Sequence, residues 1–231
     1  MSILKFIIDK DYDTEMIYHM IKSGIYKNAK DASNQMGLDF ALANKIAKTK
    51  SYYAVKNDLM KMADKKYRQS EKYLKQTVKQ YQKSWDEIDK RFFQRLQELS
   101  GAKISYRNYY CVVSLFHNGI SNWNGNKIVR HWDRNPFTQR RITAHEIIIA
   151  HFFSIARKMK VRYSDKDIWK LAEVYAFAIT GLDKTMQSFW PWDENGNYTD
   201  HNYPQFKKLQ QRLGIEILST NVNRLILREL G

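Results

Sequence analysis

The sequence predicts an α+β fold that is mainly helical and contains a small sheet, and three observations favour it. Proline and glycine are scarce, at 3 and 9 of 231 residues, which disfavours a turn-rich β fold. Residues 51–99 lack both and repeat apolar side chains at steps of three and four, which is helical spacing. Residues 103–116 are rich in β-branched and aromatic side chains, which indicates a strand.

Composition sets the expected class of protein. At 43% hydrophobic residues, the chain can bury the core of a single domain over residues 1–231. We expect a helical part at 1–100 and a second part at 101–231. The one cysteine, Cys111, excludes an internal disulfide and a cysteine-based zinc site, and it favours a reducing, cytoplasmic location. No signal peptide is expected, and no run reaches the roughly 20 apolar residues of a membrane span.

The first hundred residues are predicted to form one strand and three helices. Residues 4–8 are a short apolar run that indicates a strand. A helix over 11–25 would be capped by Asp11 or Asp13. Residues 30–48 predict a second helix, which Gly37 weakens, and residues 51–99 predict one long helix with at most one break, ended by Gly101.

Charge is the next feature, because the chain carries a formal net charge of +15. Such an excess favours contact with nucleic acid, acidic lipid or an acidic partner. The first half of the long helix is basic, and its tyrosines could stack on bases. The more common outcome of such a pattern is a solvated lysine face with tyrosines packed on a neighbouring helix. The basic residues are Lys56, Lys61, Lys65, Lys66, Arg68, Lys72, Lys75, Lys79 and Lys83.

The second part contains the best functional candidates. Strands are predicted at 109–116 and 127–132, with a turn signal at 117–119 between them. Residues 141–157 then predict a helix that is apolar nearly all round and is therefore buried, although it contains His145, Glu146 and His151. Ser164 would cap a further helix over 165–179, which carries Glu173 among apolar residues. Shorter helices are expected at 203–212 and 221–230.

Buried ionisable groups need partners, a metal ion or a shifted pKa. His145 and Glu146 begin the pattern H-E-x-x-H, in which two histidines on one helix face bind zinc beside a general-base glutamate. Ile149 stands where the second histidine would be. His151 is six residues from His145, so it points well away from it.

The order of these segments resembles the gluzincin arrangement of the zincin metallopeptidases, over residues 103–203. The resemblance implies zinc bound by His145 and Glu173, with Glu146 as the general base. It implies an extended peptide or protein substrate along the strand at 109–116. By their place in the chain, His201 or Tyr203 would stabilise the oxyanion.

Ile149 leaves the predicted site with two zinc ligands where a catalytic zinc takes three. His117, Asp200 or His201 could supply the third, or another metal could bind. Alternatively the site is dead, and His145 and Glu173 form a buried hydrogen-bonded pair. Simpler roles are open for single residues: His151 could bond a backbone carbonyl, and Glu146 could pair with Arg140, Arg141 or a lysine of the long helix. An ion pair of Glu173 is also open, with Arg130, Arg134, Arg140 or Arg141.

Three functions therefore remain. The first is a metallopeptidase-like protein with a degenerate or altered metal site, either an active hydrolase or a pseudoenzyme, with zinc present or lost. The second is a basic, non-enzymatic protein that binds nucleic acid through the long helix. The third is a structural accessory protein without a site.

Overall fold

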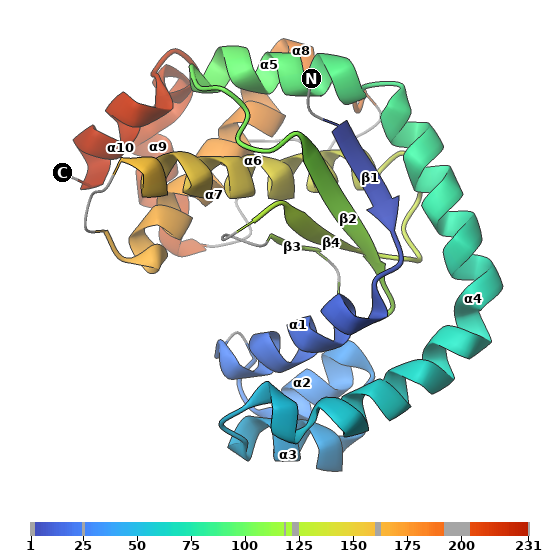
Figure 1. Ribbon diagram of the computed structural model, residues 1–231. Helices are drawn as coiled ribbons and strands as arrows, with labels where there is room; N and C mark the ends of the chain where they lie inside the picture. The colour runs from blue at the N-terminus through green and yellow to red at the C-terminus, as the bar shows by residue number, and fades with distance from the viewer. Residues whose placement is uncertain are drawn as a thin grey trace.

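The computed structural model describes residues 3–24, 26–117, 119–121, 125–159, 163–191 and 204–230. The fold is α+β and mainly helical with a small sheet, which confirms the predicted class (Figure 1). One continuous hydrophobic core contains side chains from both the first and the second part of the chain. Among the described helices, none combines the length and the apolar content that crossing a membrane requires.

The sheet has the order β1-β2-β4-β3. Its strands are β1 (Ile3–Ile7), β2 (Asn108–Ser114), β3 (Gly119–Ser121) and β4 (Lys127–His131). β2 pairs in parallel with β1 and β4, and β3 pairs antiparallel with β4. The predicted strands at 4–8, 109–116 and 127–132 are confirmed to within two residues. β3 was not predicted, because a three-residue strand beside glycine and asparagine shows no period-2 pattern.

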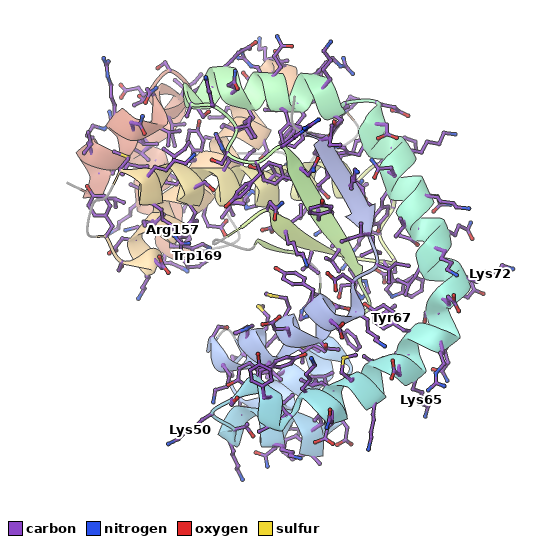
Figure 2. All side chains as sticks on the ribbon, viewed as in Figure 1. Lys50, Lys65, Tyr67, Lys72, Arg157 and Trp169 are labelled. Carbon is purple, nitrogen blue, oxygen red and sulfur yellow. The ribbon has the colours of Figure 1, made fainter. Side chains whose placement is uncertain are left out.

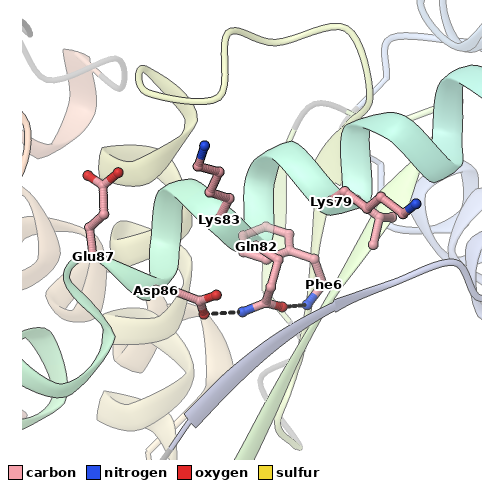
Figure 3. A pocket seen from close by; sticks show the side chains of 7 residues that line it. Phe6, Lys79, Gln82, Lys83, Asp86 and Glu87 are labelled. Carbon is pink, nitrogen blue, oxygen red and sulfur yellow. Dashed lines mark hydrogen bonds between the residues drawn. The ribbon is translucent and has the colours of Figure 1, made fainter.

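Side chains of the long helices cover the outer edge of β1. The Leu4 N–H donates to Asp89 Oδ1 at 3.0 Å. The Phe6 N–H donates to Gln82 Oε1 at 2.9 Å (Figure 3). Gln82 Nε2 donates in turn to the Leu4 carbonyl at 3.1 Å. Gln82 thus bonds the backbone as a neighbouring strand would, so the β1 edge is closed to a further strand.

The N-terminal helices differ from the prediction at two turns. α1 (Lys10–Lys22) is capped by Asp9, whose carboxylate accepts from the Tyr12 N–H, so Asp11 and Asp13 are not the cap. The predicted helix at 30–48 is two helices, α2 (Ala29–Met36) and α3 (Phe40–Lys48). Gly37 adopts a left-handed φ of 61° between them, a conformation that ends a helix.

The predicted long helix is present with one break. A short 3₁₀ turn (Tyr52–Ala54) precedes α4 (Lys56–Asp86), and α5 (Asp89–Ser100) follows after Ile88. Gly101, with φ of 63°, ends α5 as predicted. Together α4 and α5 curve around one side of the molecule and pack against β1 (Figure 1).

The second part is organised around α6 (Gln139–Lys158) and α7 (Asp165–Leu182), which pack on each other. Ser164 caps α7 as predicted, but the helix continues past Ile179 through the buried Gly181. α8 (Lys184–Gln187), α9 (Lys207–Leu213) and α10 (Val222–Leu230) follow, with 3₁₀ turns at Pro204–Phe206 and Gly214–Leu218. α6 also contacts β3 and β4, so its His-Glu pair lies near the sheet.

Candidate functional site

His145 on α6 and Glu173 on α7 meet between the two helices. His145 Nε2 lies 3.0 Å from Glu173 Oε2, within hydrogen-bond distance. The second carboxylate oxygen, Oε1, accepts from Trp169 Nε1 at 2.8 Å. Trp169 is four residues before Glu173, so one face of α7 supplies both the carboxylate and the indole that fixes it. The His145 and Glu173 side chains are 14% and 8% exposed, so the pair is nearly closed to solvent.

Burial, two carboxylates and Arg141 act on the pKa of His145. Burial lowers the pKa of His145, but the charge and hydrogen bond of Glu173, together with the charge of Glu146, raise it more. The net pKa therefore lies above the usual value for histidine. The ring of Phe177 stands edge-on to the imidazole at 5.4 Å between centroids, on the same helix as Glu173. The site favours a protonated imidazole that donates to a carboxylate.

The charge of Glu146 affects the pKa values of residues in the sheet as well as that of His145. Burial lowers the pKa of Arg130 on β4, and the charge of Glu146 is among those that counteract this effect. Burial raises the pKa of Cys111 on β2, and the charge of Glu146 raises it further. Arg130 and Cys111 are both buried. The predicted general base thus lies within electrostatic reach of a buried guanidinium.

The remaining candidate residues do not complete a metal site. Ile149 is 1% exposed and packs in the core. His117 is buried against α1, with Nε2 at 3.7 Å from Asp13 Oδ1. Within the described ranges, no group of three or more His, Cys, Asp or Glu side chains is arranged to hold a metal ion. The described residues supply two of the three protein ligands of a catalytic zinc and do not by themselves fit one. Asp200, His201 and Tyr203 lie outside the described residues.

Several of the simpler roles can be assigned from the contacts. His151 Nε2 lies 3.2 Å from Ser100 Oγ, so the expected partner, a backbone carbonyl, was wrong. Arg140 bonds Ser84 Oγ at 2.8 Å and also pairs with Glu87. The guanidinium of Arg141 lies 5.8 Å from the Phe177 ring. Glu173 bonds a histidine and a tryptophan, His145 and Trp169.

The strand expected to bind substrate is also corrected. β2, which covers most of 109–116, lies between β1 and β4 and has both edges paired, so it has no open edge for a peptide. β3 is the end strand of the sheet and packs against α6. Its outer edge has no paired strand among the described residues.

Sequence reasoning missed the roles of Trp169 and Arg130. Trp169 had a usable signal, since its spacing of four residues from Glu173 places both on one helix face. Arg130 had none, because its burial follows from long-range strand pairing. In comparisons with known proteins, no protein-family model, no curated protein and no solved structure matches this chain.

Proposed function

We propose that this chain is a metallopeptidase-like protein of the zincin type whose metal site has been replaced by a direct histidine–glutamate bond. It would bind polypeptide in extended form without hydrolysing it. The observation that carries the proposal is the 3.0 Å contact between His145 Nε2 and Glu173 Oε2, from successive helices. Two ligands on one tetrahedral zinc would be about 3.3 Å apart, from bond lengths of about 2.0–2.2 Å. The observed spacing is close to that value.

The altered site follows from Ile149. A histidine four residues after His145 would share its helix face, but an isoleucine stands there and is 1% exposed. Without that ligand, His145 and Glu173 bond each other directly, which satisfies two buried polar groups. Glu146 acts on Arg130 and His145, so its charge is balanced by cationic groups on both sides. This arrangement suits a stable polar pair more than an activated water.

The edges of the sheet favour a polypeptide partner. An extended peptide adds to an open strand edge through main-chain hydrogen bonds. Gln82 and Asp89 close the β1 edge, and β2 and β4 are internal. Among the described residues β3 is the remaining end strand, and it packs on the helix that carries His145. A peptide on β3 would therefore lie near α6, the helix that carries His145.

The test is to restore the missing ligand. Purified wild type, Ile149→His, and the matched control Ile148→His, also a buried isoleucine of α6, are loaded with zinc, dialysed and analysed for metal. We expect stoichiometric zinc in Ile149→His alone, bound at least about tenfold more tightly than in the wild type. Adding Glu173→Gln to Ile149→His should remove the gain in zinc binding. Equal zinc in Ile149→His and Ile148→His would contradict the proposed origin of the site.

A second measurement addresses polypeptide binding in the wild type. Unfolded casein labelled with fluorescein serves as the probe, with anisotropy for binding and gel analysis for cleavage. We expect saturable binding and intact casein, with and without added zinc. Cleavage that requires Glu146 and added zinc would show an active hydrolase, and absence of binding would contradict the polypeptide partner.

A further inference from the structure

A line of exposed cations follows one face of α4. At about 100° per residue, these side chains fall within a narrow arc, since successive members are three, four or seven residues apart. They span 22 residue steps, or about 33 Å at 1.5 Å per residue. Lys65 and Lys72 point away from the body of the molecule on the outer side of the curve (Figure 2). We call this set the cationic stripe: Lys61, Lys65, Arg68, Lys72, Lys79 and Lys83.

Three of the four acidic residues of α4 pair with cations outside the cationic stripe, and the fourth, Asp86, accepts from Gln82 Nε2 at 2.7 Å. Asp58 pairs with Lys45 at 2.6 Å, Asp64 pairs with Lys10, and Glu71 pairs with Lys75 at 2.5 Å. Each of these carboxylates is thus bonded to a cation outside the stripe. Lys61 and Arg68 act on Asp58 and Asp64 only through longer-range charge. No member of the stripe forms an ion pair with a described carboxylate.

Carrying these charges is unfavourable for the isolated helix. Like charges four residues apart destabilise a helix by about 0.2–0.5 kcal/mol per pair. The stripe contains such pairs at 61 and 65, at 68 and 72, and at 79 and 83. A bound polyanion would relieve this repulsion.

The stripe ends where the charge changes sign. Lys79 and Lys83 line one groove with Phe6 and Gln82, and Asp86 lines the same groove (Figure 3). Glu87 lines this groove as well and pairs with Arg140. The anionic partner is therefore expected along the outer face of α4 and not along α5.

The exposed surface of α4 disfavours two classes of anionic partner, single-stranded nucleic acid and a membrane surface. Single strands bind by stacking bases on aromatic rings. Tyr73, at 59%, is the exposed aromatic of α4, whereas Tyr81 and Trp85 are buried. Helices that lie in a membrane surface need several exposed apolar residues beside the cations. Tyr73 is the large hydrophobic side chain that α4 exposes, so α4 does not meet this requirement.

We propose that the cationic stripe binds the phosphate backbone of a nucleic-acid duplex, independently of base sequence. The stripe's length of about 33 Å is close to one turn of B-form DNA, about 34–36 Å. Lysine and arginine contacts to phosphate position a protein on a duplex without reading bases. The proposal is independent of the histidine–glutamate site, because α4 and its cations contribute nothing to that pair.

The test compares two variants of the full chain with the same change in net charge. The stripe variant carries Lys65→Gln, Arg68→Gln, Lys72→Gln and Lys79→Gln. The control variant carries glutamine at four exposed lysines of α7 and α9: Lys166, Lys170, Lys207 and Lys208. Glutamine keeps the helical propensity of lysine and arginine, so both variants should fold. The probes are 30-base-pair DNA and RNA duplexes of mixed sequence, titrated by fluorescence anisotropy at several salt concentrations.

We expect the wild type to bind a duplex with an affinity that falls as salt rises. The slope of log affinity against log salt should decrease by about 3–4 in the stripe variant, at roughly 0.9 per lost phosphate contact. The stripe variant should bind at least about tenfold more weakly, and the control variant within about threefold of the wild type. Equal losses in both variants, or no duplex binding by the wild type, would overturn the proposal. Binding to phosphatidylserine vesicles without duplex binding would also overturn it and would assign the stripe to a membrane surface.

Discussion

His145 and Glu173 form a hydrogen-bonded pair between α6 and α7, with 3.0 Å between Nε2 and Oε2. The pair lies next to Glu146, whose charge also acts on the imidazole. Because both side chains are nearly closed to solvent, their protonation and the stability of the fold are linked. The pair can therefore be tested through stability, independently of any activity.

The first prediction is that Glu173→Gln changes how stability depends on pH. Glu173 and Glu146 raise the pKa of His145 in the folded state against the effect of burial. A raised pKa contributes stability that is full below the unfolded value of about 6.5 and is lost as pH rises through the folded value. We expect Glu173→Gln to lose about 1–3 kcal/mol in urea unfolding near pH 6, with a smaller loss at pH 8.5.

Asp165→Asn is the matched control for this prediction. Asp165 is on the same helix, and its carboxylate is 59% exposed beside Arg157. Exposed ion pairs contribute about 0–1 kcal/mol, so a small loss without pH dependence between 6 and 8.5 is expected. A pH-independent loss in Glu173→Gln would contradict a charged His145.

The second prediction concerns His151, whose contribution to the stability of the fold depends on pH with the opposite sign. Burial lowers the pKa of His151 to about 4. Its Nδ1 atom has no hydrogen-bond partner among the described residues. Because the unfolded chain binds a proton near pH 6.5 and the folded chain does not, stability falls as pH falls from about 6.5 to 4.

The variant His151→Leu should remove this sensitivity to acid. Ser100 Oγ retains the Gln97 and Ala102 carbonyls as acceptors, so leucine leaves no hydroxyl unpaired. We expect similar stability to the wild type at pH 7 and a stability higher by about 2–3 kcal/mol at pH 4.5. Urea unfolding at both pH values measures this. If both proteins lost the same stability on acidification, the loss would come from groups other than His151.

The third prediction is that Gln82→Ala opens the β1 edge. Gln82 bonds the Phe6 N–H and the Leu4 carbonyl. Losing both should cost about 1–3 kcal/mol and expose an edge that promotes self-association. Gln80→Ala is the control, since Gln80 is exposed on the same helix. Unfolding and sedimentation together test this: equal behaviour of the two variants would show that Gln82 does not protect the edge.

The fold could be predicted where the pattern was long or the signal was chemical. The apolar run at 141–157 predicted α6, and Ser164 predicted the start of α7. Gly101 predicted the end of α5. By contrast, β3 has only Gly119–Ser121, and its pairing with β4 is a tertiary contact. A three-residue segment carries too little pattern to predict a strand.

The site could be predicted in part for the same reason. His145 and Glu173 were candidates because each is ionisable on an apolar helix. Their convergence depends on how α6 packs on α7, and the resemblance to a known arrangement suggested it before any contact was known. The strand at 109–116 was predicted correctly as a strand but given the wrong position, because strand order in a sheet is set by pairings far apart in the sequence.

The last prediction concerns the buried carboxylate of Asp13. It accepts from Tyr67 at 2.7 Å, from Ser114 at 2.5 Å and from the Leu115 N–H at 3.4 Å, and it is fully buried. These contacts join α1 and α4 to the end of β2. Asp13→Ala would leave buried donors unpaired, so we expect a loss of about 3–5 kcal/mol.

The matched control for Asp13 is Asp11→Ala, two residues earlier in the same helical turn. Asp11 is exposed, and its backbone carbonyl accepts from Thr14 Oγ, a contact that alanine preserves. Its carboxylate near the helix N-terminus is worth about 0.3–1 kcal/mol. Urea unfolding of both variants at pH 7 compares the two carboxylates directly. If Asp13→Ala lost no more stability than Asp11→Ala, the contacts of Asp13 would not be what attaches α1 and α4 to the sheet, and packing of Ile17 and Tyr18 on the core would have to do so.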